Sequence, residues 1–286
     1  MNYIASFSGG KDSTAMILKC IENNYPLDEI ITFDCGSWEF PAIREHILKF
    51  KKFIEETTDI KFTIVTNEHS FDYMLSELKM KKGVRKGKKG YGFPRPNARW
   101  CTTYKIKTIN DYIAENYSEV IQYIGFAIDE KSRKRQKIIK EYIDKNKYNQ
   151  KRLEFGPPNL KNINNINEKI IFPLIDINMT EQMALQYCYK CGWDFGGLYN
   201  FFDRVSCWCC PLQSKDEVYI LIEKFPELWE KLKKMEELCK LNQIPYSSFK
   251  HDGDCITYEY KNEKRKYDEK CQDKLIDNNL EYFKSR

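Results

Sequence analysis

The stretch Ser8-Gly9-Gly10-Lys11-Asp12-Ser13 stands directly after a short apolar run, residues 3–7, and directly before a helical run, residues 14–23. Two glycines at the end of a strand let the backbone turn sharply and approach an anion closely. Successive N–H groups and the positive end of the following helix then point at one oxyanion. Lys11 adds a mobile positive charge, and the two serines add hydroxyl donors. The stretch therefore predicts a phosphate-binding loop.

Neither of two better-known phosphate motifs, G-x-x-x-x-G-K-[ST] and G-x-G-x-x-G, is present. Ser-Gly-Gly-Lys-Asp-Ser after an N-terminal strand instead closely resembles the pyrophosphate loop of the adenine nucleotide alpha hydrolase superfamily. This superfamily includes ATP pyrophosphatases, tRNA and DNA thiolating enzymes and the phosphoadenylyl sulfate reductases. The resemblance implies an adenine nucleotide, ATP or an adenylyl sulfate, bound by Ser8, Gly9, Gly10, Lys11, Asp12 and Ser13. It also implies catalytic roles for Lys11 and for Asp12, which would help to hold Mg²⁺. A Gly-Gly turn with an accidental Lys is the alternative.

The composition is that of a globular protein. The chain has 286 residues, of which 42% are hydrophobic and 31% are charged, enough for one large domain or for a domain with an appendage. No apolar run approaches the roughly 20 residues of a membrane span, and the N-terminus begins with a strand rather than a signal peptide. We expect no membrane association and a cytoplasmic location.

The order of elements predicts an α/β fold. Short β-branched or aromatic runs at residues 3–7, 29–34, 61–66 and 120–126 alternate with helical stretches near 13–24, 41–57, 70–80 and 102–116. This alternation indicates an open, mostly parallel sheet with helices on both faces. A long Gly-, Lys- and Pro-rich loop is expected at 81–99 and an excursion at 145–169. A strand at 170–175, a helix from Thr180 to about Cys191 and a helical C-terminal extension, including 225–241, should follow.

Further segments resemble the phosphoadenylyl sulfate reductase family within this superfamily. Residues 34–41, Asp-Cys-Gly-Ser-Trp-Glu-Phe-Pro, resemble its D-T-G-x-x-F-P segment, with Cys35 in place of Thr and one extra residue before Phe40. The resemblance places Asp34 and Gly36 beside the nucleotide, at the carboxyl edge where open α/β sheets bind ligands. A polar turn without function is the alternative.

Residues 125–133 match in part the family's G-x-R-x-x-E-S-x-x-R stretch, which implies that Gly125 and Glu130 contact the nucleotide. Ala127 replaces the expected Arg. Residues 173–176 and 196–199 resemble the family's P-L-x-D and L-Y segments. We therefore expect a nucleotide-binding domain over residues 1–213 that ends in a cysteine cluster, followed by a helical extension over 214–286.

Residues 99–102, Arg-Trp-Cys-Thr, resemble the family's R-W-C-T signature at the start of a helix. A thiol at a helix N-terminus with cations nearby ionises readily, which suits a nucleophile or a metal ligand at Cys101. The resemblance also assigns Arg99 to the nucleotide. A buried, inert cysteine is the alternative.

Eleven cysteines in a chain of cytosolic character point to metal or sulfur chemistry rather than to disulfides. Cys207 and Cys210 form a C-x-x-C before Pro211. The family resemblance implies that Cys101 lies near this turn as a third ligand, and Cys188 is the expected fourth ligand, with Cys191 as its substitute. Thiolate ligands favour an iron–sulfur cluster or Zn²⁺ over harder ions. The family resemblance implies a [4Fe–4S] cluster, with Zn²⁺ as the alternative. Cys209 would carry sulfur. A redox dithiol or simple packing also stays open, and buried thiols are expected at Cys20, Cys35, Cys239, Cys255 and Cys271.

Two basic clusters, at residues 79–89 and 131–137, suggest capture of a polyanion. A nucleic acid, tRNA or DNA, is one expected partner, and solvated surface segments are the alternative.

The resemblance implies sulfur chemistry with three readings. In the first, ATP adenylates an acceptor, and a sulfur that is carried by a cysteine or cluster, with a sulfur donor protein as one candidate partner, displaces AMP. In the second, the chain is a phosphoadenylyl or adenylyl sulfate reductase that works with a thioredoxin-like protein. The reductases' C-terminal E-C-G-[LI]-H tail is missing, and residues 269–271, Glu-Lys-Cys, resemble it only weakly. In the third, the chain binds nucleotide or nucleic acid without catalysis.

Overall fold

The structure is a computed structural model and describes residues 1–81, 85–147 and 170–284. The chain divides into two compact units, each built from two separate stretches of sequence. Met1–Glu68 and Thr102–Val205 form the first, here called the sheet unit, and His69–Cys101 and Ser206–Arg286 form the second, here called the helical unit. A domain boundary after residue 213 stays a prediction.

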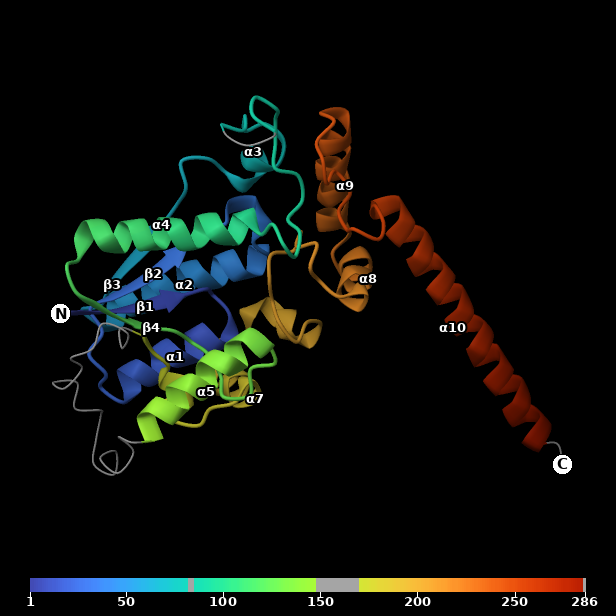
Figure 1. Ribbon diagram of the computed structural model, residues 1–286. Helices are drawn as coiled ribbons and strands as arrows, with labels where there is room; N and C mark the ends of the chain where they lie inside the picture. Colours follow the sequence, from blue (N-terminus) through green and yellow to red (C-terminus); the bar gives the residue numbers. More distant parts are fainter. Residues whose placement is uncertain (82–84, 148–169, 285–286) are drawn as a thin grey trace. The chain divides into compact units, whose positions relative to one another are not determined.

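The sheet unit contains an open sheet of five strands in the order β3-β2-β1-β4-β5 (Figure 1). Every pairing in it is parallel, which confirms the predicted α/β fold. The strands are β1 (Asn2–Phe7), β2 (Glu29–Phe33), β3 (Lys61–Val65), β4 (Val120–Tyr123) and β5 (Ile170–Ile171).

The central strand β1 lies between β2 and β4, so the chain reaches its two neighbours by crossovers in opposite directions. Ala5 in β1 is fully buried and pairs with Ile30 on one side and Tyr123 on the other. Open α/β sheets bind ligands at the carboxyl ends of the strands where this direction reverses. The loops that follow β1 and β4 therefore mark the expected place of a site.

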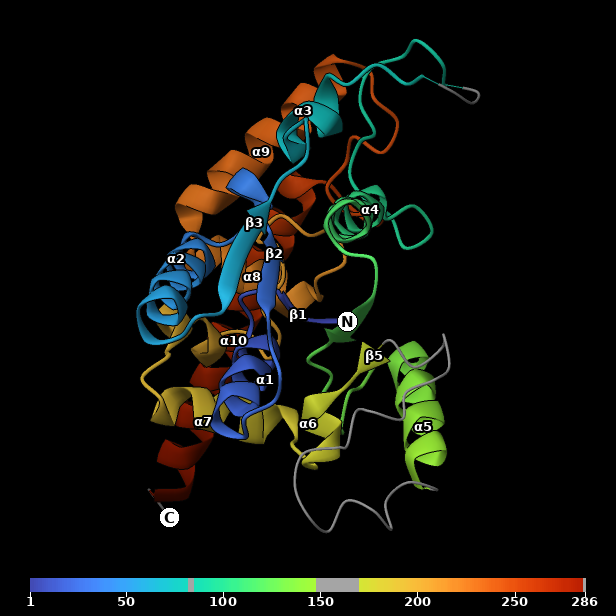
Figure 2. The same cartoon turned by 90° about the vertical axis from the view of Figure 1, so that its left-hand side faces the viewer.

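Helices cover both faces of the sheet (Figure 2). α1 (Lys11–Glu22) and α2 (Pro41–Thr57) lie on one face, and α4 (Trp100–Asn116) and α5 (Arg133–Lys147) lie on the other. α7 (Glu181–Lys190) packs against α1. The predicted N-cap of α7 is confirmed, since the Thr180 hydroxyl accepts the Met183 N–H at 3.2 Å.

Two elements of the sheet unit differ from the sequence prediction. The strand predicted at 170–175 is wrong beyond Ile171, because Pro173 begins a helical turn, α6 (Pro173–Asp176). Proline lacks an N–H for the sheet and its fixed φ suits the first helical position. Helix α5 was not predicted from the sequence, and most of the excursion expected at 145–169 lies outside the described residues.

The helical unit contains α3 (Phe71–Ser76), α8 (Lys215–Lys224), α9 (Pro226–Leu241) and α10 (Cys255–Lys284). Helices α8, α9 and α10 confirm the predicted helical C-terminal extension. The core of the helical unit includes the fully buried rings of Phe93, Trp208 and Phe249. Lys79 and Lys89 pair as an antiparallel bridge, and the Met80 N–H donates to the Lys88 carbonyl at 2.9 Å, so residues 79–81 and 85–89, here called the lysine hairpin, lie side by side. Within the described ranges, no helix combines the length and apolar character that a membrane crossing requires.

Candidate functional site

The predicted phosphate loop joins β1 to α1 in a conformation that requires glycine. Gly9 has φ +74°, in the left-handed region, and a Cβ there would lie 2.8 Å from the Cγ1 of Ile47 on α2. A Cβ on Gly10 would lie 3.3 Å from the Tyr199 hydroxyl. Gly9 is thus needed both for its backbone conformation and for its close approach to α2.

Backbone donors gather at the start of α1. Gly10 is the N-cap of α1 and provides no side-chain cap. In the described part of the chain, the N–H groups of Gly10, Asp12 and Ser13 have no protein acceptor. The Ser13 hydroxyl donates to the Gly10 carbonyl at 3.0 Å and accepts the Ser8 N–H at 3.2 Å, which fixes the shape of the loop. Free N–H groups at a helix N-terminus suit a phosphate oxygen.

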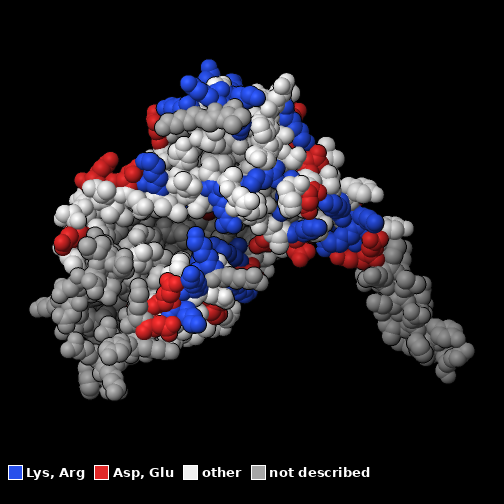
Figure 3. All heavy atoms as spheres, viewed as in Figure 1, with Lys and Arg blue, Asp and Glu red and all other residues white. Residues whose placement is uncertain are grey.

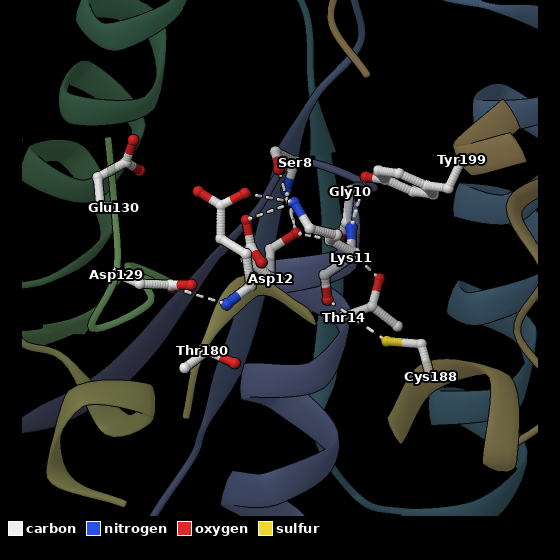
Figure 4. Close-up of polar contacts among 12 residues, drawn as sticks. Ser8, Gly10, Lys11, Asp12, Thr14, Asp129, Glu130, Thr180, Cys188 and Tyr199 are labelled. Carbon is white, nitrogen blue, oxygen red and sulfur yellow. Dashed lines mark hydrogen bonds and ion pairs between the residues drawn. The ribbon is translucent and has the colours of Figure 1, made fainter. Parts of the chain in front are cut away.

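The Lys11 ammonium is buried beside this loop and paired with carboxylates (Figure 4). Lys11 is only 4% exposed, and its Nζ lies 3.1 Å from Glu181 Oε2 and 3.5 Å from Asp12 Oδ2. Glu181 is the first residue of α7. A buried cation whose partners are carboxylates can exchange them for the oxygens of a phosphate group.

Asp12 has the properties of a metal ligand. Burial raises its pKa to about 6; the Lys11 ammonium opposes the rise, and the carboxylates of Glu181 and Glu130 add to it. Its Oδ1 atom is buried and has no hydrogen-bond partner among the described residues. An unpartnered carboxylate oxygen next to a phosphate loop fits Mg²⁺, which binds one or two carboxylates together with substrate phosphates.

The loop after β4 closes on the start of α1. A Cβ on Gly125 would lie 3.0 Å from the Asp12 carbonyl oxygen, so this position requires glycine. Ala127, where the family pattern has Arg, is 1% exposed and brings no charge. The Asp129 carboxylate accepts the Glu181 N–H at 2.8 Å, which ties this loop to α7.

Glu130 binds Arg135. The Arg135 guanidinium donates to Glu130 Oε2 at 2.5 Å and lies over the Phe126 ring, 4.8 Å from its centroid. Burial alone would raise the pKa of Glu130, but the Arg135 ion pair outweighs it and holds that pKa below its ordinary value. Glu130 therefore stays anionic and positions Arg135, and its contact with the nucleotide stays a prediction.

The loop after β2 is held by Asp34. Its carboxylate accepts the Gly36 N–H at 2.7 Å, and Arg44 Nη2 lies 3.8 Å from it. Gly36 has φ +62° with open space where a Cβ would stand, so glycine is needed there for conformation alone. The nucleotide contacts assigned to Asp34 and Gly36 stay predictions.

Cys188 lies beneath the phosphate loop. Its thiol is fully buried and donates to the Lys11 carbonyl at 3.4 Å, while burial raises its pKa to about 12. This contact gives Cys188 a structural role under α1, and its role as a fourth metal ligand stays a prediction. Cys191, the substitute, is exposed. Buried thiols occur where single inert cysteines were expected, at Cys20, Cys35, Cys239 and Cys255; the Cys271 side chain lies outside the described ones.

The helical unit contains three of the predicted metal ligands, Cys101, Cys207 and Cys210. The Cys210 N–H donates to the Cys207 carbonyl at 3.0 Å, which forms the C-x-x-C turn. Burial raises the pKa of Cys210, and the nearby Cys101 thiol adds to the rise. The charge of Cys101 therefore acts on Cys210. Soft thiol donors suit an iron–sulfur cluster or Zn²⁺, and joint ligation by Cys101, Cys207 and Cys210 stays a prediction.

Cys209 and Arg99 are two further predicted site residues. Cys209 is fully buried, and burial raises its pKa well above the ordinary value, so its thiol is protected rather than placed to carry sulfur. Arg99, expected at the nucleotide, belongs to the helical unit, where its charge acts on Cys210. Both roles stay predictions.

A buried cation supports the cysteine turn. The Lys250 ammonium is 7% exposed and donates to the carbonyls of Pro211 at 3.0 Å and Gln213 at 2.6 Å.

Sequence reasoning did not identify Lys250 or Glu181, and it gave Tyr199 no role. The L-Y resemblance includes Tyr199, but no local pattern indicates the contacts of Glu181 and Tyr199 with Lys11, because the two residues lie 170 and 188 positions from it.

The chain is similar to a known protein family and to a protein of another organism. The family model of the phosphoadenosine phosphosulfate reductase domain matches residues 2–213, from β1 to the C-x-x-C turn. An uncharacterized protein of Methanocaldococcus jannaschii, MJ0973, is 27% identical over 230 residues, which are 79% of this chain and 45% of that protein. The chain thus spans about half the length of this relative.

Proposed function

We propose that this chain, which belongs to the phosphoadenosine phosphosulfate reductase domain family, is an ATP-dependent enzyme of sulfur transfer. An oxygen of the acceptor attacks the α-phosphate of ATP, the bond from the α-phosphorus to the bridging oxygen breaks, and pyrophosphate leaves. A sulfur nucleophile then forms a bond to the acceptor atom that carries the activated oxygen, and AMP leaves with that oxygen. We place this reaction in the cytoplasm, where cysteines stay reduced.

The observation that carries ATP over adenylyl sulfate is the acidic oxygen beside the phosphate loop. The buried Oδ1 of Asp12 has no partner among the described residues, and the carboxylates of Glu130 and Glu181 act on the same group. Such a site suits a polyphosphate that arrives with Mg²⁺. Mg²⁺ bound at Asp12 would supply neutralising charge for the phosphates.

The residues of the loop stabilise the leaving group. Negative charge builds up on pyrophosphate as it departs, and the free N–H groups of Gly10, Asp12 and Ser13 are preorganised to receive it. The buried Lys11 ammonium adds a full positive charge at the same place. These groups need no reorientation when the charge develops.

The cysteine turn is the proposed source of sulfur or electrons. Cys101, Cys207 and Cys210, with Cys188 as the predicted fourth ligand, would hold a [4Fe–4S] cluster, which supplies redox or sulfur chemistry when bound. Zn²⁺ at the same thiols would make the site structural and leave sulfur delivery to a donor protein.

Reduction of a phosphoadenylyl or adenylyl sulfate, with a thioredoxin-like partner, is the second candidate, and the family's own description favours it. It requires a thiol that attacks the sulfur of the nucleotide. A binding module without catalysis is the third candidate, and the intact phosphate loop favours an enzyme over it.

A nucleic acid is the acceptor that we propose first. Exposed lysines gather on the hairpin of the helical unit, at Lys79, Lys81, Lys86, Lys88 and Lys89 (Figure 3). Clusters of this kind bind phosphate backbones without reading sequence. A small metabolite is the other class of acceptor.

Pyrophosphate release from anaerobically purified protein tests the proposal. ATP is supplied with tRNA, duplex DNA or a panel of small metabolites, and released pyrophosphate and AMP are measured, with Lys11→Ala as the inactive control. We expect release that depends on one class of acceptor. Sulfite formed from an adenylyl sulfate and reduced thioredoxin, without pyrophosphate release from ATP, would identify a reductase instead.

A further inference from the structure

One hydrogen bond joins the phosphate loop to the segment η4 (Phe195–Asn200). The backbone N–H of Lys11, at the first position of α1, donates to the Tyr199 hydroxyl at 2.9 Å (Figure 4). The hydroxyl lies directly against the loop, since a Cβ on Gly10 would stand 3.3 Å from it. Tyr199 therefore reaches the group of donors to which the proposed function assigns the phosphates.

The Tyr199 hydroxyl still has a proton to donate. Its oxygen is the acceptor in the bond from Lys11, so its own hydrogen is not used there. Among the described residues, no acceptor receives that hydrogen. Burial raises the pKa of Tyr199, which keeps the hydroxyl protonated at neutral pH. A neutral donor beside a loop that receives phosphate is placed to bind an anionic oxygen.

The tyrosine ring is fixed before any ligand binds. Phe195 contacts it edge-on with the ring centroids 5.0 Å apart, and the Lys11 Nζ lies 5.4 Å from its centroid. Gly196, with φ +61°, approaches α2 so closely that a Cβ would lie 2.6 Å from the Cβ of Ala42. A donor held in this way loses little conformational entropy on binding.

We propose that Tyr199 is a ligand of the pyrophosphate group of the nucleotide: its hydroxyl accepts the Lys11 N–H and donates its own proton to a phosphate oxygen. This inference rests on the proposed function, because it adds a donor to the same anion. Since the loop receives the pyrophosphate part of ATP, the added bond favours nucleotides that carry pyrophosphate over AMP. Tyr199 is then a specificity-determining residue as well as a ligand.

Tyr199→Phe tests this inference because it removes the hydroxyl and keeps the ring. We expect the Kd of inorganic pyrophosphate and of ATP to rise about tenfold, the effect of one hydrogen bond to a charged group. The Kd of AMP should change less than about twofold, because AMP lacks that group. Calorimetry measures all three, and thermal melting checks that the variant folds. Tyr189→Phe is the matched control, because Tyr189 is 40% exposed on α7.

The outcomes separate this inference from the proposed function. If the Tyr199→Phe variant binds pyrophosphate as well as the wild type or better, the hydroxyl only occupies the Lys11 N–H until the anion displaces it, and the inference is refuted. Equal weakening of AMP and pyrophosphate would show a structural role and would refute it too. A wild-type protein that binds neither ATP nor pyrophosphate refutes the proposed function itself.

Discussion

The Lys11 ammonium and the Glu181 carboxylate form an ion pair at 3.1 Å between α1 and α7, although 170 positions separate them in sequence. The pair keeps a buried cation beside the free N–H groups of the phosphate loop. It also means that an incoming phosphate competes with Glu181 for Lys11. The same carboxylate therefore organises the site and opposes anion binding.

Glu181→Gln should strengthen pyrophosphate binding when Mg²⁺ is removed by a chelator. The variant releases Lys11 and removes a negative charge, and an ion pair of this exposure is worth about 1 kcal/mol, or roughly fivefold in Kd. Calorimetry with inorganic pyrophosphate measures the change. Glu22→Gln is the control, since Glu22 pairs with Lys19 at the far end of α1. Weaker binding in the Glu181→Gln variant would contradict the competition.

Asp12→Asn should stabilise the metal-free protein in a way that depends on pH. Burial raises the pKa of Asp12 in the folded protein to about 6, whereas the ordinary value is 3.8. The stability that this carboxyl contributes is therefore fully present below about pH 4 and is lost as the pH rises through about 6. Asn behaves like the protonated form at every pH.

Denaturant unfolding in the presence of chelator, at intervals between pH 4 and pH 8, measures the difference between wild type and Asp12→Asn. The free energy of unfolding of Asp12→Asn should exceed that of the wild type by an amount that grows from about pH 4 to about pH 6 and stays constant above that. Asp59→Asn, at an exposed position, should show no such trend. A difference in the free energy of unfolding that is the same at all these pH values would mean that Asp12 is not desolvated in solution.

Nucleic acid should bind through the lysine hairpin, weakly and with strong dependence on salt. Replacing Lys79, Lys81, Lys86 and Lys88 by Gln leaves up to four phosphates without a cationic partner. For duplex DNA, the slope of log K against log salt should fall by about 0.9 for each phosphate that is no longer neutralised. Titration of tRNA and of duplex DNA at several salt concentrations measures it. Lys231→Gln with Lys234→Gln, exposed on α9, is the control. No binding at low salt would indicate a small-molecule acceptor.

Local patterns predicted most of the sheet unit. Apolar runs identified the strands, and α2 has the predicted bounds, residues 41–57, because Pro41 stands at its first position. Helix α5 was not predicted because its sequence is dominated by charged residues. The phosphate loop is a contiguous motif, so sequence located Lys11 and Asp12. Their partners Glu181 and Tyr199 depend on how α7 and η4 pack, which no local pattern encodes.

The cysteine turn should bind iron rather than zinc. Cys101, Cys207 and Cys210 belong to one unit, and the charge on one thiol affects another. Lys250, which donates to the carbonyl of Pro211 directly after the turn, brings a buried positive charge that offsets ionised thiols. Cys thiolates are the usual ligands of iron–sulfur clusters.

Elemental analysis of anaerobically prepared protein tests this site. Iron and acid-labile sulfide should be present in the wild type and absent from Cys207→Ala and Cys210→Ala. Cys239→Ala, which removes a fully buried thiol elsewhere in the helical unit, should keep both. Loss of iron in Cys188→Ala as well would assign the fourth ligand, whereas retention would leave that thiol its structural contact with Lys11. Stoichiometric zinc without iron would make the turn a structural site. Protein that is active without any metal would refute the cluster.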